Sequence, residues 1–233
     1  MPPAPDGLNA GADTPGRRQR FGLVLVFITA SFMVEGTLSG NDWAQFVVTA
    51  LLGTTLLLTF WAADMKPRLL RRAAIAVVAA VAAVIVTVAL GDNTAEGIGR
   101  LANAALVALA PPALVIGMLR SIRRNQAVTL EAVLGGLSLY VLVGMFFAFV
   151  FGAVDNLGGE PFFAQGVAAT PERCSYFSFS TLTTVGFGDL TARGDLGRTL
   201  AVFEALVGSL YLVTVVSVGV SNLVPRYRLG GDR

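Results

Sequence analysis

The sequence predicts an all-α membrane protein with six transmembrane helices, and three observations support this. Hydrophobic residues make up 55% of the 233 residues, charged residues only 14%, and the mean hydropathy is +0.70. A soluble domain carries about 25% charged residues. Six stretches approach the roughly 20 apolar residues that a helix needs to cross a bilayer. Basic and acidic residues also alternate between the connections that join these stretches.

The six predicted spans are residues 21–38, 43–63, 73–90, 101–119, 130–154 and 196–224. The first is the shortest and carries Glu35 near its end. The fourth contains Pro111 and Pro112, which lack backbone donors and are expected to kink or break a helix. Two interpretations stay open there: a kink tolerated by packing, or a broken helix that lines a substrate site, as in transporters.

The connections between the spans predict that both chain ends are cytoplasmic. One side carries the basic residues Arg17, Arg18, Arg20, Lys66, Arg68, Arg71, Arg72, Arg120, Arg123, Arg124, Arg226 and Arg228. The other side carries Asp42, Asp92, Glu96, Asp155, Glu160, Glu172, Asp189 and Asp195, against Arg100, Arg173, Arg193 and Arg198. Lys and Arg are enriched in cytoplasmic loops, so the basic side faces the cytoplasm and the chain is expected in the plasma membrane. Residues 1–20 show no signal-peptide pattern and are expected as a disordered cytoplasmic tail, with a short second tail at 226–233.

The composition argues against catalysis. The chain has no histidine and one cysteine, Cys174, which excludes intramolecular disulfides, imidazole bases and the usual zinc sites. No nucleotide-binding fingerprint occurs. We therefore expect a protein that is not an enzyme, needs no cofactor and binds no nucleic acid. Cys174 is expected to be a small packing residue.

The external connection between the fifth and sixth spans predicts a short helix that enters the membrane part way. Pro171 and Glu172 suit the first turn of a helix, and the apolar sequence CSYFSFSTL follows at 174–182. The chain then returns through STLTTVGFGDLTA at 180–192. This returning limb is polar and rich in glycine, although it lies at membrane depth in this prediction.

Residues 184–188, TVGFG, predict a site for a dehydrated cation. Irregular backbone at membrane depth is tolerated only where protein buries it or water lines it. Glycine adopts backbone conformations that other residues avoid, so the alternation could turn successive carbonyl oxygens toward one axis while Val185 and Phe187 pack behind. Carbonyl oxygens are hard ligands for cations. The residue types by themselves indicate no particular cation.

The sequence TLTTVGFGD at 181–189 resembles the signature of the potassium channel pore family, whose selectivity filter usually reads TVGYG. The resemblance covers residues 130–224 and implies an outer helix, a pore helix, a filter and an inner helix, hence a pore domain at 126–225. Because the chain holds one such filter, the resemblance also implies a homotetramer around a fourfold axis, surrounded by membrane lipid. It implies potassium as the permeant ion, coordinated by the backbone carbonyls of Thr184, Val185, Gly186 and Phe187.

The family pattern gives further residues a role and shows two departures. Gly188 would let the backbone turn outward, and Asp189 would sit behind or above the filter. Phe187 stands where tyrosine is usual, so a hydroxyl that ties the filter to the pore helix is missing; we hypothesise a less rigid filter that collapses more readily at low potassium. Ser180 occupies a position where some relatives carry a carboxylate, so an acid pair with Asp189 is not available.

Two residues of the last span are candidates for gating. Gly208 lies where the family often has a hinge glycine, but small residues also favour close helix packing in membranes, and both interpretations stay open. Glu204 is an intramembrane carboxylate that should face protein or water. We expect it to hydrogen-bond the pore helix, either tuning the filter or serving structure alone.

The first four spans, residues 21–125, resemble the layout of a voltage-sensing domain. A sensor needs several charges within the field, yet the fourth span has Arg100 at its outer end, Arg120, Arg123 and Arg124 at its inner end, and nothing basic between. We therefore predict weak or absent voltage gating and interpret these arginines as topology determinants. The four-helix domain is either a lipid-facing surround or a binding site for a separate regulatory subunit.

Together these observations predict a potassium-selective channel that conducts passively. A poorly selective cation channel is the nearest alternative. Proteins of other classes remain as further alternatives: an ion transporter subunit, suggested by Pro111 and Pro112, and a non-conducting sensor built on a channel scaffold, since fold does not determine function.

Overall fold

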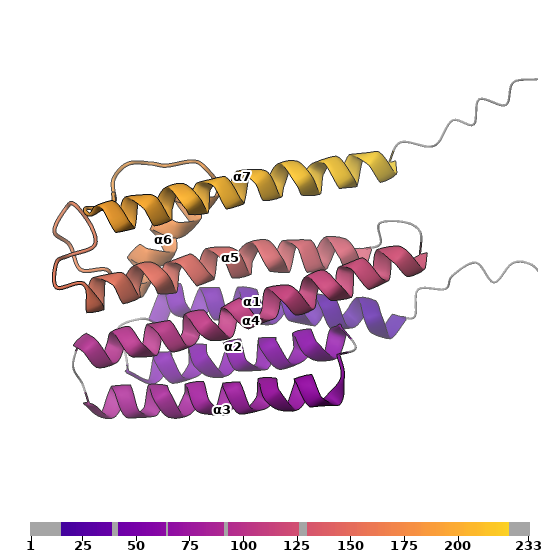
Figure 1. Cartoon of the computed structure of the whole chain (residues 1–233), viewed down its shortest axis with the longest axis horizontal. Helices are drawn as coiled ribbons and strands as arrows, with labels where there is room; N and C mark the ends of the chain where they lie inside the picture. Colours follow the sequence, from indigo (N-terminus) through magenta and orange to yellow (C-terminus); the bar gives the residue numbers. More distant parts are fainter. Residues whose placement is uncertain (1–14, 39–41, 64, 91–92, 126–129, 224–233) are drawn as a thin grey trace, which may run out of the picture.

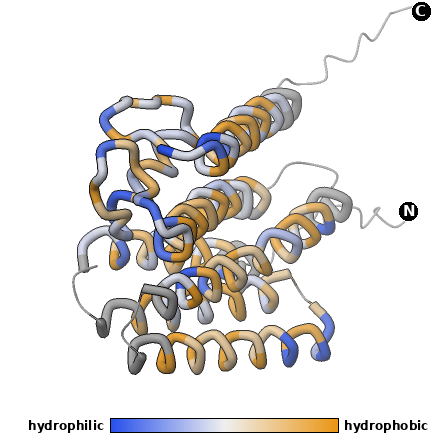
Figure 2. Tube along the Cα trace, turned by 60° about the vertical axis from the view of Figure 1, so that its left-hand side comes forward, coloured by the Kyte–Doolittle hydropathy of each residue, from blue (hydrophilic) through white to orange (hydrophobic). Residues whose placement is uncertain are grey.

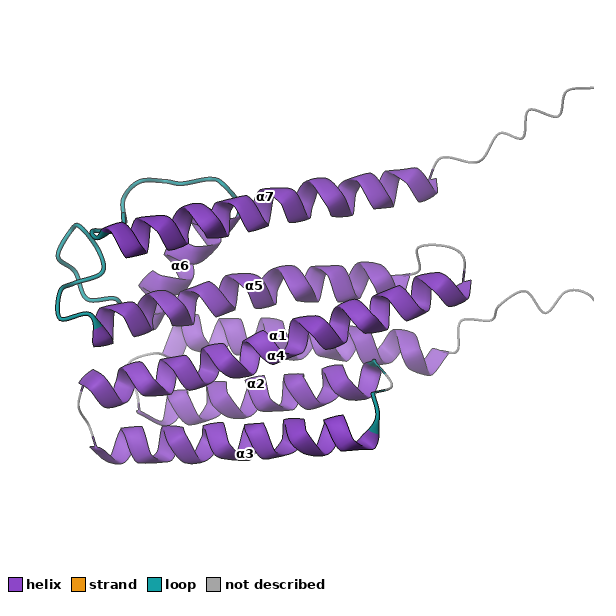
Figure 3. Cartoon of the chain, in the orientation of Figure 1, coloured by secondary structure: helices purple, strands orange, loops and turns teal. Residues whose placement is uncertain are grey.

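The computed structural model describes residues 15–38, 42–63, 65–90, 93–125 and 130–223, and its regular secondary structure there is helical (Figures 1 and 3). The helices of these residues are α1 (Pro15–Leu38), α2 (Asp42–Ala62), α3 (Pro67–Leu90), α4 (Asn93–Asn125), α5 (Leu130–Leu157), α6 (Pro171–Leu182) and α7 (Asp195–Leu223). Six of them contain the predicted apolar stretches, and α6 is the predicted short helix.

Three helix starts differ from the hydropathy prediction. Helix α1 begins at Pro15, so residues 15–20, expected as part of the tail, are helical. Helices α3 and α4 begin at Pro67 and Asn93, ahead of their predicted apolar stretches. In all three cases the first turns are polar, which hydropathy does not detect, and in α1 and α3 proline suits the first helical position. Residues 1–14 and 226–233 of the predicted tails lie outside the described residues.

By length and composition, five helices of the described residues can cross a membrane: α1, α3, α4, α5 and α7. The described apolar part of α2, Phe46–Ala62, is shorter. Figure 2 shows apolar residues along the helices and hydrophilic residues gathered at helix ends and in loops. This distribution is typical of a membrane protein.

Helices α1 to α5 form one bundle, and α7 lies outside it (Figure 1). In the described residues α4 packs along α5, α1 contacts both α2 and α5, and α7 contacts only α5 and α6. The core of the bundle is apolar and includes Val24, Ile28, Leu56, Leu114 and Leu142. In the described residues α1 and α4 therefore attach the four-helix part to α5.

Helix α4 runs through Pro111 and Pro112 without interruption. The predicted alternatives were a kink or a break, and the structure shows no break at this point (Figure 1). Both prolines remove a hydrogen bond to the preceding turn. Their neighbours Ala110, Ala113 and Leu114 are buried, so close packing of the bundle holds the helix together where backbone bonds are missing.

Candidate functional site

Helix α6 begins where the sequence predicts. Pro171 occupies the first turn, Glu172 adds an acidic group there, and the amide of Cys174 donates to the carbonyl of Thr170 (2.9 Å). Thr170 itself has extended backbone angles, φ −63° and ψ 156°. Proline and the carboxylate both favour this end of a helix.

A cluster of aromatic rings fixes α6 against α5 and the loop between them. Phe177 lies at its centre, with ring centroids 5.1 Å from Phe151, 5.8 Å from Phe162 and 5.6 Å from Phe163. Such pairs add to the stability that burial alone gives. Cys174 is buried in the same cluster, and burial raises the pKa of its thiol to about 12. The thiol therefore stays protonated and packs as a small apolar group.

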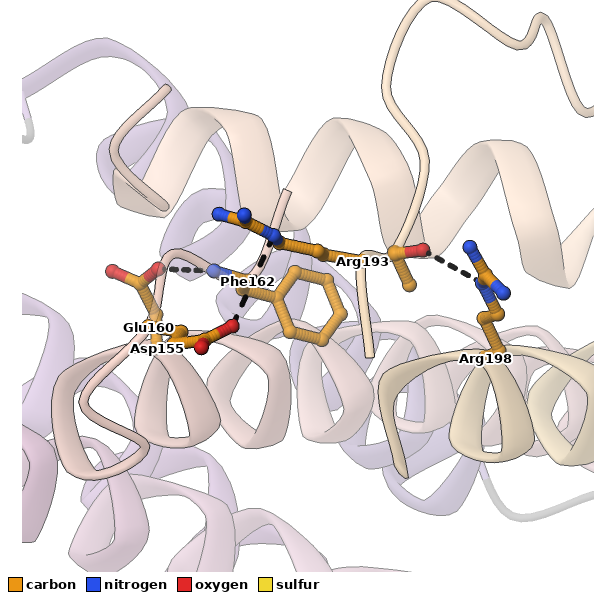
Figure 4. A network of polar contacts seen from close by, with 6 residues as sticks. Asp155, Glu160, Phe162, Arg193 and Arg198 are labelled. Atoms are coloured by element: carbon orange, nitrogen blue, oxygen red, sulfur yellow. Dashed lines mark hydrogen bonds and ion pairs between the residues drawn. The ribbon is translucent and has the colours of Figure 1, made fainter. Parts of the chain in front are cut away.

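Two loops meet above this cluster and form the outer surface of the site (Figure 4). Asp155, near the end of α5, accepts a hydrogen bond from the Phe162 amide (2.7 Å), and the Phe162 carbonyl accepts one from the Arg193 amide (2.8 Å). Arg198 of α7 donates from Nε to the Ala192 carbonyl (3.2 Å). The exposed pair of Arg193 with Glu160 (3.9 Å) adds little. The loops before and after α6 are thus joined by their backbones.

The segment at residues 184–188, called the filter segment below, turns back against the end of α6. The amide of Thr184 donates to the Thr181 carbonyl (2.9 Å), and the amide of Gly186 donates to the Ser180 carbonyl (3.0 Å). The Ser180 hydroxyl donates to the Phe177 carbonyl (3.0 Å). Ser180 therefore holds the filter segment with its backbone, not with its side chain.

The backbone of the filter segment alternates in the sign of φ. Thr184 has φ +60°, Gly186 +55° and Gly188 +81°. Thr184 is the one non-glycine residue with positive φ among the described residues, a conformation that costs about 1–3 kcal/mol. Alternation between the two hands turns neighbouring peptide groups to the same side of the chain. This is the backbone that a row of carbonyl ligands requires.

The side chains of the filter segment are linked to α6 through Tyr176, which the sequence analysis missed. The ring of Phe187 stacks on that of Tyr176 (5.9 Å, 9°), and the Tyr176 hydroxyl donates to Oδ1 of Asp189 (3.1 Å). Partial desolvation and then the bond to Asp189 raise the pKa of Tyr176, so the hydroxyl remains a donor. The tie that Phe187 cannot make is supplied from α6. The available signal was a tyrosine in the predicted short helix.

Gly208 lies where α7 meets the end of α6. A Cβ atom at this position would collide with the carbonyl oxygen of Leu182 and lie 2.9 Å from Leu182 Cδ1. The same carbonyl accepts a hydrogen bond from the Tyr140 hydroxyl of α5 (3.2 Å). Close packing is thus a sufficient reason for a glycine at position 208, without a hinge.

Glu204 contacts helix α6, and the sequence predicts this contact. It is 0% exposed, and its Oε1 atom lies 2.5 Å from Oγ of Ser178. Ser178 also lies 2.7 Å from the carbonyl oxygen of Gly144 on α5. Ser178 therefore stands between the helices on either side of α6.

The four-helix part of the chain contacts α6 and the loop directly before it. Arg100 of α4 donates to the carbonyl of Ala169, directly before α6 (2.8 Å). The ring of Phe32 on α1 lies 4.6 Å from that of Phe179 on α6. The sequence interpretation of Arg100 as a topology determinant missed this bond, because its acceptor is a backbone carbonyl far away in the chain.

The described residues contain no group of three or more His, Cys, Asp or Glu side chains that could hold a metal ion. The oxygens that the filter segment offers to a cation are those of its backbone and of the Thr184 hydroxyl. A site of this kind suits a cation that moves through, because it lacks the charged ligands that hold Ca²⁺ or Mg²⁺ tightly.

A comparison with known protein families matches the part of the chain that contains this site. Residues 135–224 match the model of a family described as ion channel. The match covers less than half of the chain and takes in most of α5, all of α6, the filter segment and α7. It indicates an ion channel and a protein that is not an enzyme. Neither curated proteins nor solved structures gave a match.

Proposed function

We propose that the chain is one subunit of a homotetrameric channel that conducts potassium passively through the filter segment. The observation that carries this proposal is the backbone of residues 184–188. Its φ angles alternate in sign, and the Gly186 amide is bonded to the Ser180 carbonyl of α6. The match of residues 135–224 to an ion channel family supports the coarser part of this proposal, that the chain forms an ion channel.

In this proposal each subunit contributes the carbonyls of Thr184, Val185, Gly186 and Phe187 to stacked rings, and the Thr184 hydroxyl closes the innermost site. Potassium exchanges its hydration shell for these oxygens, and ions in adjacent sites repel one another through the pore. Gly188 turns the chain outward, and the bond of Asp189 to Tyr176 (3.1 Å) supports the mouth.

Exposure of the single chain supports the homotetramer. The filter segment is exposed, and α7 carries a row of exposed apolar residues: Val202, Leu206, Leu210 and Val213. A closed ring of identical subunits buries such a surface and creates a central path from one filter per chain. Lipid covers the outward face of the remaining helices.

The chain is proposed to cross the plasma membrane six times with both ends in the cytoplasm. The described apolar part of α2, Phe46–Ala62, is at the short end of the range for a membrane span. Voltage gating is proposed to be weak, because Arg100 and Arg120 donate to the carbonyls of Ala169 and Ala63 (2.8 and 2.9 Å). Arginines held in this way are not free to move through the field.

A poorly selective cation channel is the second candidate, favoured by the phenylalanine at 187. The transporter alternative was suggested by a possible break at Pro111 and Pro112. Because α4 is continuous there, this argument for a transporter no longer applies. A non-conducting sensor remains the alternative of another class.

The test is a planar bilayer with the purified protein, potassium on one side and sodium on the other. Currents that reverse near the potassium equilibrium potential are expected. Reversal near zero would replace potassium selectivity by the poorly selective channel. If no current appears, Gly208 and Glu204 variants are recorded as well, and continued silence together with silent flux assays in vesicles would favour the sensor.

A further inference from the structure

Ser178 of α6 makes two contacts that a single hydroxyl hydrogen cannot serve. Its Oγ lies 2.7 Å from the carbonyl oxygen of Gly144 on α5 and 2.5 Å from Oε1 of Glu204 on α7. Both distances are those of hydrogen bonds. Ser178 and Glu204 are 0% exposed, so both contacts lie inside the protein.

Counting hydrogens decides how these contacts are made. A serine hydroxyl has one hydrogen to donate and two lone pairs to accept with, and a carbonyl oxygen only accepts. If Ser178 donates to Gly144, the hydrogen between Ser178 and Glu204 must come from the carboxyl group. If Ser178 donates to Glu204, two oxygens face each other at 2.7 Å with no hydrogen between them. A carboxylic acid at Glu204 satisfies both contacts.

The surroundings of Glu204 favour the same form. In the described part of the chain its Oε2 atom is buried without a hydrogen-bond partner, which an ionised carboxylate tolerates poorly. Of the ionisable groups on helices packed against α7, Tyr140 of α5 interacts electrostatically with Glu204, and none on α6 does. Tyrosine brings no positive charge, so nothing described here compensates an anion.

We propose that Glu204 is held as a carboxylic acid whose hydrogen fastens the inner helix to the pore helix. The carboxyl of Glu204 donates to Ser178, and Ser178 donates to the Gly144 carbonyl, so one line of hydrogen bonds crosses from α7 through α6 to α5. Glu204 is then a positioning residue for the helix that carries the filter segment. Loss of this proton would break the line and leave a buried anion.

The hydrogen bonds from Glu204 through Ser178 to Gly144 lie close to the filter segment. Their importance for that segment rests on the proposed channel function. Gly144 also leaves room for the Phe179 ring, because a Cβ there would come within 2.6 Å of it. The helices α5 and α6 therefore meet closely at the point where Ser178 donates. Two residues after Ser178, the Ser180 carbonyl holds the Gly186 amide (3.0 Å).

Infrared spectroscopy of the full-length protein at neutral pH tests the protonated state without requiring conduction. Glu204→Gln is expected to remove intensity from the carbonyl band of protonated carboxyl groups, and Ser178→Ala to shift that band. Glu35→Gln is the matched control for the other buried carboxyl of the described residues, Glu35. Loss of carboxylate intensity in Glu204→Gln instead, with the carboxyl band intact, would overturn the proposal.

A rescue series tests the positioning role. The amide of Glu204→Gln keeps a donor for Ser178, whereas Glu204→Leu does not. The current of Glu204→Leu at low potassium is expected to decay at least fivefold faster than that of Glu204→Gln, and Ser178→Ala should behave like Glu204→Leu. Equal decay in the Gln and Leu variants would refute positioning by a donated hydrogen. If no variant conducts, the channel proposal fails, and the infrared result still decides whether Glu204 is protonated.

Discussion

At the scale of single residues, Tyr176 and Phe187 show how the mouth of the filter segment is held. The TVGFG pattern predicts an irregular, glycine-rich backbone at residues 184–188, and the use of its carbonyls as ligands stays a prediction. The sequence could not predict the bond between Tyr176 and Asp189 (3.1 Å), because that contact exists only after the chain reverses direction at the end of α6. Although Phe187 has no hydroxyl, the bond from Tyr176 to Asp189 holds the end of the filter segment to α6.

Removing the Tyr176 hydroxyl should weaken the mouth. The bond to Asp189 is exposed to solvent, so part of its contribution is replaced by water when it is lost. Tyr176→Phe is therefore expected to speed the decay of current at low potassium severalfold at most, with the stacked ring kept. The measurement is current decay in a bilayer after potassium is lowered.

Phe187→Tyr is the complementary variant, because it adds a hydroxyl where the family usually has one. It should slow the same decay, in line with the hypothesis of a less rigid filter. The reversal potential serves as the control and should stay constant in both variants. Unchanged decay in both would show that hydroxyl ties do not limit the stability of this filter.

At the scale of helices, hydropathy predicted the apolar stretches, and Pro171 with Glu172 predicted the start of α6. The polar first turns of α1, α3 and α4 were not predicted. Hydropathy also left two interpretations for Pro111 and Pro112, because the outcome depends on how tightly neighbouring helices pack around Ala110 and Leu114. Apart from the contact of Glu204 with α6, contacts between helices could not be predicted for the same reason. They depend on which face each helix turns toward its neighbour.

Gly208→Ala tests whether α7 packs at its glycine. The added Cβ would meet the Leu182 carbonyl, which is backbone and cannot turn away. Overpacking of this kind costs about 1–3 kcal/mol, so a lower unfolding temperature in detergent is expected. Gly22→Ala is the matched control, because nothing lies within 4 Å of a Cβ there and alanine favours the helix. A stable Gly208→Ala protein with altered gating would favour the hinge.

The contact of Phe32 with Phe179 (4.6 Å) predicts that α1 supports the pore helix. Truncation of a buried phenylalanine costs about 3–5 kcal/mol. Because Phe32 is only partly buried, Phe32→Ala should destabilise the protein by about 2 kcal/mol and speed current decay at low potassium. Met33→Ala, next to it on the exposed face, is the control. If both variants behave alike, the four-helix part does not brace the filter segment.

At the scale of the whole molecule, two apolar surfaces are exposed in the single chain, one on α7 and one on α3. The bundle of α1 to α5 buries its own core, whereas in the described residues α7 packs only on α5 and α6 and turns much of its apolar surface outward. In the proposed tetramer the α7 surface would lie between subunits, and the outward face of α3 would face lipid. The sequence could not separate these surfaces, since both are uniformly apolar.

Paired asparagine substitutions test which of these two surfaces lies between subunits. Leu206 and Leu210 on α7 are 54% and 66% exposed in the single chain, and Ile75 and Val78 on α3 are 60% and 68% exposed. Each pair lies about one helical turn apart, so the two double variants add the same polar groups at matched exposure.

The α7 variant, Leu206→Asn with Leu210→Asn, should lose tetramer in native mass spectrometry or cross-linking, because it places polar groups in the packed ring. The α3 variant, Ile75→Asn with Val78→Asn, should remain tetrameric, since its surface faces lipid. Tetramers of equal abundance from both variants would mean that this face of α7 is not the subunit interface.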